Sequence, residues 1–237
     1  MAVSNLRTGQ TFAQSEGSFE TASIVKIDIA ATLFLRAADT GRQVTAAELA
    51  QITHMIEKSS NTAATSLWED IGGTDGLNRA NRQIGLRRST AGPSRYWGLT
   101  QTDANDQLVL LRQVFGSESK LQPAARAVIR TRMATVDSGQ RWGISAAGSE
   151  AALKNGWIQR TNTKRWNINS MGRITYEGDK YLIAVLTKNN LTKGDGIRTV
   201  EAVAQNAIKA ISASSTAASC GNSMRPTASS WVVNSHD

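Results

Sequence analysis

The chain of 237 residues is poor in cysteine and histidine. Its single cysteine is Cys220, which excludes an internal disulfide and any metal site built from cysteines. The two histidines are His54, within a helical pattern, and His236, the penultimate residue. A Ser-His-Asp triad and a histidine-rich zinc site are therefore not expected. If the protein is a hydrolase, its base is a residue other than histidine.

Long apolar runs are also absent. No stretch of eighteen apolar residues occurs, so no membrane span is predicted. The opening MAVSNLRTGQ lacks the basic start and apolar centre of a signal peptide, which fits a cytoplasmic protein or one whose leader was removed. The formal net charge of +8 attracts anions such as nucleic acid, wall polymer or carboxylates. Because the basic residues are scattered and no basic-aromatic motif is present, we expect a solvated basic face and no nucleic-acid partner.

The hydrophobic share of 40%, with six tryptophans, is enough for a sizeable core. Alternating patterns predict strands, patterns with a period of 3.6 predict helices, and Thr45 with Glu48 forms a capping box. The segment 85–102 is predicted as a loop, and Gly196 precedes the final helix. The expected strands are 2–6, 11–13, 151–157, 166–175 and 180–187, and the expected helices start at 23, 45, 61, 75, 103 and 123.

This order of elements predicts an α+β fold. Strands at both ends of the chain form one antiparallel sheet, and an all-helical subdomain is inserted between them. We expect a single domain over 1–212, with a sheet part from 1–22 and 150–212 and a helical part from 23–149. Residues 213–237 are rich in serine, alanine and threonine and are expected to form a low-complexity tail.

A first motif, Ser23-Ile24-Val25-Lys26, stands at the start of an apolar helix. A serine hydroxyl needs a base to become a nucleophile, and residues three apart share a helix face, so Lys26 Nζ is expected beside Ser23 Oγ. Burial would lower the pKa of Lys26 toward neutrality, and the helix start offers free N–H groups to an oxyanion. A serine cap followed by an outward lysine fits the same four residues.

A second motif, Ser59-Ser60-Asn61, precedes another helix. Serine and asparagine are ordinary helix caps, which is one interpretation. In the functional interpretation, Ser59 Oγ relays a proton to the leaving group, and the Asn61 amide donates to a substrate carbonyl.

A third motif, Lys154-Asn155-Gly156-Trp157, falls on a predicted strand. Glycine inside a strand often marks the close approach of a ligand or another backbone. Lys154 would bind a substrate carboxylate, and the Trp157 backbone N–H would be a second oxyanion donor. The alternative is an edge-strand lysine beside a β-bulge.

The ordered pattern S-x-x-K, S-x-N followed by T-A-A, and K-x-G on a strand resembles the serine β-lactamases and DD-peptidases, the penicillin-recognising superfamily. The resemblance covers about residues 2–212 and is closest to class A and to actinobacterial proteins labelled serine hydrolases. It implies a β-lactamase/transpeptidase-like fold, no cofactor, no metal and an extracytoplasmic location. It also implies the roles of the motif residues: Ser23 as acylated nucleophile, Lys26 as base or relay, Ser59 and Lys154 as proton shuttles and carboxylate binders, Asn61 as acyl side-chain holder, and Asn155, Gly156 and Trp157 as substrate-binding residues.

The sequence departs from that family where water would be activated. Ser60 replaces the usual aspartate of S-D-N, and Asn155 replaces a hydroxyl residue and alters the carboxylate pocket. The family's Ω-loop glutamate has no counterpart, because 85–102 contains no Asp or Glu. Asp103 is the first acid after the loop and is expected to cap its helix. Acylation is therefore supported and fast deacylation is not.

These observations lead to an expected function with two alternatives. The chain is expected to be a serine hydrolase that forms an acyl-enzyme at Ser23 and deacylates slowly. Its substrate would be a small molecule or peptide with an amide or ester near a carboxylate. The alternatives are an acyltransferase or esterase on the same fold, and a non-catalytic penicillin-binding-like pseudoenzyme. The sequence does not indicate the oligomeric state.

Overall fold

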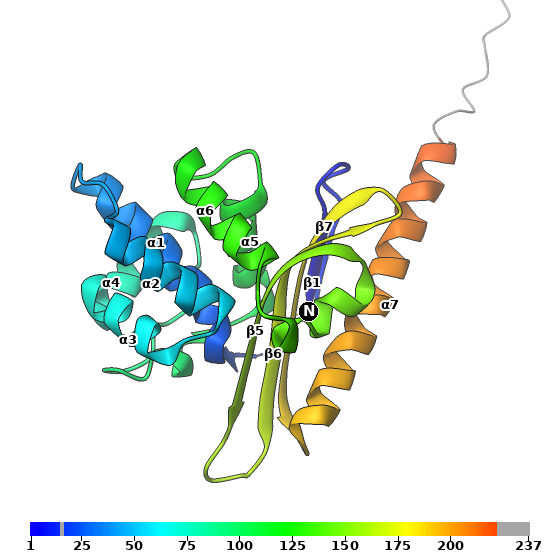
Figure 1. Cartoon of the computed structure of the whole chain (residues 1–237). Coiled ribbons are helices and arrows are strands. Elements are labelled where there is room, and N and C mark those ends of the chain that lie inside the picture. Colours follow the sequence, from blue (N-terminus) through cyan, green and yellow to red (C-terminus); the bar gives the residue numbers. More distant parts are fainter. Residues whose placement is uncertain (15–16, 222–237) are drawn as a thin grey trace, which may run out of the picture.

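The computed structural model describes residues 1–14 and 17–221 as an antiparallel sheet covered by helices on both faces (Figure 1). The strands are β1 (Ala2–Asn5), β2 (Thr11–Ala13), β3 (Phe19–Glu20), β4 (Gln101–Thr102), β5 (Ser149–Gln159), β6 (Trp166–Tyr176) and β7 (Asp179–Asn190). The α-helices are α1 (Val25–Asp39), α2 (Ala46–Glu57), α3 (Asn61–Asp70), α4 (Gly73–Ile84), α5 (Ala104–Phe115), α6 (Pro123–Ala134) and α7 (Lys193–Gly221). Short 3-10 turns are η1 (Ala22–Ile24), η2 (Trp97–Leu99), η3 (Ser138–Gln140) and η4 (Gly143–Ala147).

The main sheet joins the two ends of the described chain. Its strand order is β2-β1-β7-β6-β5, with every pairing antiparallel. The last two strands are linked by Glu177 and Gly178, both at positive φ, as a two-residue hairpin turn requires. The predicted α+β architecture, with a sheet from both chain ends and a helical insertion, is confirmed.

The helices lie in layers on the two faces of the main sheet. Helix α7 and η4 lie against one face of the sheet, and α5 and α6 contact the other (Figure 1). Helices α1 to α4 form the helical part beyond them (Figure 1). Helix α1 is the centre of that part, because its residues are buried on nearly all sides and it contacts α2, α3, α4 and α6.

Some boundaries differ from the predicted ones. Helix α4 begins at Gly73, two residues early, and the segment predicted as a loop contains η2 and β4. Strand β4 is two residues long and pairs with the equally short β3, and such short strands leave no alternating pattern in the sequence. Helix α7 begins before Gly196 and continues through Gly221, into the segment predicted as a tail. The rest of that segment, 222–237, lies outside the described residues.

In the described part of the chain, no helix is both long enough and apolar enough to cross a bilayer.

One acidic side chain is buried inside the helical part. Asp28 lies on α1 and is 2% exposed. Burial raises the pKa of its carboxyl to about 7; the Asn81 amide opposes this shift, and the charge of Asp106 adds to it. The core is therefore built for the neutral form of this carboxyl.

We predict that Asp28→Asn removes a pH dependence of stability. Between about pH 4 and pH 7 the folded chain keeps a proton on Asp28 that the unfolded chain has lost, so stability falls as pH rises through that window. The free energy of unfolding of the variant, relative to wild type, should rise across it by up to about 4 kcal/mol. Urea denaturation at pH 4.5 and 7.5 measures this, with exposed Asp70→Asn as the control. An equal pH dependence in wild type and Asp28→Asn would contradict the prediction.

Candidate active site

The three predicted motifs meet where the helical part joins the sheet. Ser23 lies in η1, directly before α1, and is half-buried. Ser59 and Asn61 stand at the start of α3, and Lys154 lies on β5, which packs against η1. Segments more than 90 residues apart in the sequence therefore contribute to one site.

Gly156 lets β5 approach the start of α1. A Cβ atom at this position would lie 2.7 Å from Thr21 O and 2.8 Å from Ser23 N. Both neighbours are backbone atoms, so they cannot move aside as a flexible side chain would. The glycine marks the close backbone approach that its place inside a strand predicts, and it brings the neighbouring Trp157 toward Ser23.

Two non-glycine residues in the site have left-handed backbone conformations. Ala22, which precedes Ser23, has φ of 47°, and Ser59 has φ of 54°. Such a conformation costs on the order of 1 kcal/mol or more and persists only where surrounding contacts hold it. Ala22 is buried, and Ser59 is held by hydrogen bonds from two lysines.

Lys26 points from α1 toward the start of α3. Its Nζ donates to Ser59 O at 2.6 Å, to Ser59 Oγ at 3.1 Å and to Asn61 Oδ1 at 2.8 Å. Its side chain is fully buried, and its Nζ lies 5.0 Å from the centre of the Trp97 ring. These three acceptors fill all three donor positions of an ammonium group.

Lys154 reaches the same hydroxyl from the opposite side. Its Nζ lies 3.0 Å from Ser59 Oγ and also donates to Gln140 Oε1 at 3.3 Å. The Ser59 hydroxyl therefore bridges two buried lysines, one on a helix and one on a strand. Among the described residues, neither lysine forms a salt bridge.

The lack of a carboxylate partner shifts both amines. Burial lowers the pKa of Lys26 to about 7. Burial lowers the pKa of Lys154 well below its usual value, and the charge of Lys26 lowers it further. Near neutral pH the two amines together therefore carry fewer than two positive charges. Ser59 Oγ, which lies between them, can pass a proton from one amine to the other.

The expected Ser23–Lys26 contact is not a hydrogen bond in this structure. In the described residues, the donors of Lys26 go to Ser59 and Asn61 only. A neutral amine has two donors and one lone pair. Loss of a proton from Lys26 therefore frees one of its three positions to accept from a neighbouring hydroxyl.

Asn155 is fully buried and turned away from the cleft. Its Nδ2 donates to Gln140 O at 2.7 Å and to Trp142 O at 3.0 Å. Both hydrogens of its amide are thus used inside the protein, where they hold the end of η3 and the residues after it against β5. Its predicted contact with substrate has no support in this geometry, and Asn155 acts on the site by holding Gln140.

A cleft of about 500 Å³ opens beside Ser23. Of the residues predicted for the site, Ser23, Asn61 and Trp157 line it. The opposite wall comes from η2 and the residues before it, including Arg95 and Trp97. The described lining contains no Asp, Glu or His, so no carboxylate or imidazole faces the hydroxyl of Ser23.

The segment 85–102 is held in place by acids at its base. The Asp106 carboxylate accepts from the backbone N–H groups of Arg87 and Arg88. Asp103 caps α5 by accepting from Asp106 N at 2.8 Å, which confirms the expected capping role. The acid nearest to this segment is therefore used structurally.

Sequence reasoning missed Trp97 and Gln140. The Trp97 indole donates to Thr65 Oγ1 at 3.1 Å, which holds its ring over Lys26. The sequence feature that could have indicated Trp97 is the aromatic pair Tyr96-Trp97, which lies in a predicted loop without Asp or Glu. Gln140 lies in a short 3-10 turn and has no pattern that marks it in the sequence.

Comparison with known proteins gives a family match. A profile described as the Beta-lactamase enzyme family matches residues 35–213, a range that begins after Ser23 and Lys26. No curated protein matches the chain.

Solved structures of similar fold include β-lactamases and PBP-A. TLA-3 extended-spectrum β-lactamase has a TM-score of 0.74 at 14% identity, covering 87% of this chain and 92% of its own. PBP-A has a TM-score of 0.74 at 20% identity, covering 89% and 88%. A β-lactamase from Xanthomonas campestris has a TM-score of 0.68 at 19% identity, covering 86% and 88%. The profile match and the shared architecture place the chain in the β-lactamase enzyme family, with the fold of a β-lactamase-like serine hydrolase.

Proposed function

We propose that the protein forms an acyl-enzyme at Ser23 on an amide or ester that lies near a carboxylate. The observation that carries this proposal is the Ser59 hydroxyl, held 3.1 Å from Lys26 Nζ and 3.0 Å from Lys154 Nζ beside the cleft that contains Ser23. Burying two amines on one hydroxyl costs stability, and groups with pKa values shifted in this way are concentrated at functional sites.

Acylation begins with Lys26 in its neutral form. Its lone pair takes the Ser23 hydroxyl proton while Oγ attacks the carbonyl carbon, so the new C–O bond forms as negative charge moves to the carbonyl oxygen. The backbone N–H groups of Ser23 and Trp157 are the proposed donors to that oxyanion. The tight contact of Gly156 with the start of α1 keeps these two backbone segments together.

Collapse of the intermediate breaks the bond to the leaving group. Ser59 Oγ gives its proton to the departing nitrogen or oxygen and takes one from Lys26 or Lys154. Lys154 is also the group proposed to attract the substrate carboxylate. Asn61 lines the cleft and is proposed to hold the acyl side chain once its Oδ1 is released from Lys26.

Hydrolysis of the acyl-enzyme is proposed to be slow. General base activation of water supplies a factor of roughly 100 to 10,000, and the described cleft lining offers no acid to provide it. The Trp97 ring covers Lys26 instead. The same observation favours a second candidate, acyl transfer to an amine or alcohol, because a bound acceptor could replace activated water.

One protein of similar fold supports the acylation step of this proposal. One solved structure is a mutant of PBP-A in an acyl-enzyme complex with penicillin G, at 21% identity and a TM-score of 0.73. We propose that a β-lactam or a peptide-like compound acylates this chain as well.

Benzylpenicillin or a fluorophosphonate should add its mass to the wild-type protein, and peptide mapping should place the adduct on Ser23. Ser23→Ala should show no adduct, because Ser23 is the one serine among the described residues that line the cleft. Intact-mass spectrometry checks both. Retained labelling of Ser23→Ala would overturn the nucleophile assignment, and an unlabelled wild type would favour the non-catalytic alternative.

The acylation rate should rise between pH 6 and 8 with a midpoint near 7. The neutral form of Lys26 is the active one, and the pKa of Lys26 is about 7, so the rate increases as pH passes that value. Lys26→Arg keeps a permanent charge and should lose the rise together with most of the rate. The profile is measured by quenching the reaction at set times, at each pH in this range, and determining the adduct fraction by intact-mass spectrometry. A flat profile in wild type would rule out Lys26 as the base.

Trp97→Glu should shorten the life of the adduct by about 100-fold or more. The substitution places a carboxylate in the loop that faces Ser23 and removes the ring from Lys26. Trp97→Gln, which has the same length without the charge, is the matched control and should have a smaller effect. Adduct decay after removal of excess reagent gives both lifetimes. If the Glu and Gln variants decay at one rate, a missing base does not limit deacylation.

A further inference from the structure

The cleft beside Ser23 is not the only hollow that Arg160 borders. Arg160, near the end of β5, also lines a second hollow of about 210 Å³. Its guanidinium pairs with Glu20 on β3 at 2.9 Å, and Asn167 donates to the same carboxylate. Arg160 lines both hollows, whereas Glu20 lines only the second.

Every described residue that lines the second hollow is polar. Four of the nine carry amide groups, and Glu20, which pairs with Arg160, contributes a carboxylate. Asn167 is 7% exposed, while Lys188 and Asn189 are exposed. Amide groups both donate and accept hydrogen bonds, so they match the alternating donors and acceptors of a peptide chain. An apolar acyl group would gain little there.

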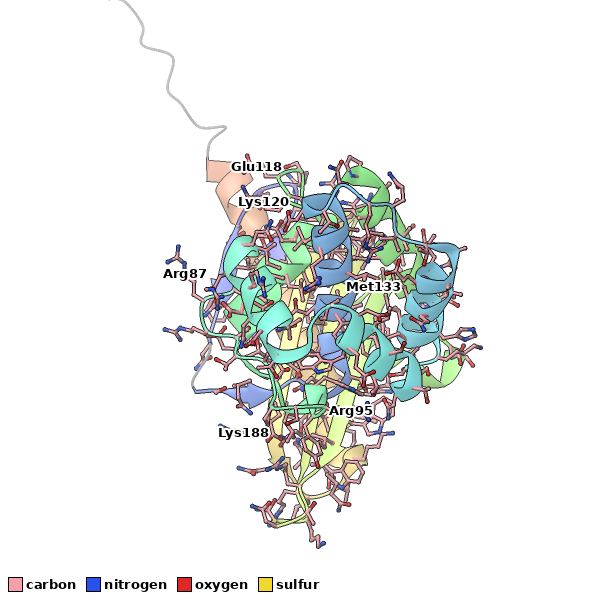
Figure 2. All side chains as sticks on the ribbon, turned by 90° about the vertical axis from the view of Figure 1, so that its left-hand side faces the viewer. Arg87, Arg95, Glu118, Lys120, Met133 and Lys188 are labelled. Carbon is pink, nitrogen blue, oxygen red and sulfur yellow. The ribbon has the colours of Figure 1, made fainter. Side chains whose placement is uncertain are left out.

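Positive charge follows the same path. Arg95 lines the cleft, Arg160 borders both hollows and Lys188 lines the second. Arg95 pairs with Glu69. In the described chain no acid pairs with Lys188, whose Nζ donates to the backbone oxygen of Ser18. Figure 2 shows Arg95 and Lys188 toward the same end of the molecule.

We infer that the acyl donor is an extended, peptide-like anion that crosses Arg160 and places a carboxylate beside Lys188. This inference rests on the proposed acylation of Ser23 and adds the identity of the acyl side of the substrate. The amides of the second hollow bind its peptide groups, and Arg160 and Lys188 bind its charge.

The test uses two thioester donors with the same dipeptide, one capped by N-acetyl and the other by N-succinyl. They differ by a terminal carboxymethyl group, which carries one added negative charge. Wild type should form the Ser23 adduct about tenfold faster with the succinyl donor, as expected for one hydrogen-bonded charge. Arg160→Gln and Lys188→Gln should each reduce this preference to about twofold.

The control is Lys120→Gln, which removes one positive charge at the opposite end of the molecule (Figure 2). It should keep the full preference, because general attraction to the net charge is not the cause. Lys188→Gln keeps the experiment decisive if Arg160→Gln disturbs the contact with Glu20.

The outcomes separate the two claims. Equal rates with both donors in wild type, or a preference that survives in Arg160→Gln and Lys188→Gln, overturn the inference. An equal loss in Lys120→Gln overturns it too. If benzylpenicillin labels Ser23 and neither thioester does, the peptide-like donor is wrong while the proposed function stands. If no reagent labels Ser23, the proposed function itself fails.

Discussion

The site depends on keeping two amines out of water with no carboxylate to balance them. Lys26 and Lys154 are both fully buried, and Ser59 Oγ lies between them. An ion pair would stabilise each ammonium and keep each lysine protonated at neutral pH. The described core instead leaves the two amines to share one hydroxyl, and burial lowers the pKa of each below that of an exposed lysine. Burial of the two amines lowers the stability of this part of the fold, and it brings their pKa values down so that a proton can pass between them more easily.

The sheet and the helical part are both needed for this arrangement. Helix α1 is buried on nearly all sides and holds Lys26 rigidly. Strand β5 brings Lys154 from the other part, and Gly156 sets how close the strand can come. The left-handed conformation of Ser59 then directs its hydroxyl to both lysines. Each residue of the site is thus fixed by packing that reaches into the core.

Much of this fold could be predicted from the sequence. The period-two strands, the capping box at Thr45 and the helix start at Pro123 all follow local rules, and the structure has them. The short strands β3 and β4 could not be predicted, because two residues carry no pattern and their pairing is a long-range contact.

The chemistry was predictable in part. The spacing of the motifs indicated which residues gather, since each lies at the start of a helix or within a strand. It did not indicate that Lys26 would bond to Ser59 and Asn61, or that Asn155 would turn inward toward Gln140. Those outcomes depend on which acceptors remain free after folding. Trp97 was missed for the same reason, because only the folded loop brings its ring to Lys26.

The strand order has a consequence for synthesis of the protein. Ser23 and Lys26 leave the ribosome more than a hundred residues before Lys154, and β1 cannot complete its place in the sheet until β7 has emerged. Until Lys154 has emerged, Ser59 Oγ lacks the second of its two lysine partners. A nascent chain therefore carries an incomplete site, because the contact between Ser59 and Lys154 can form only after β5 has been made.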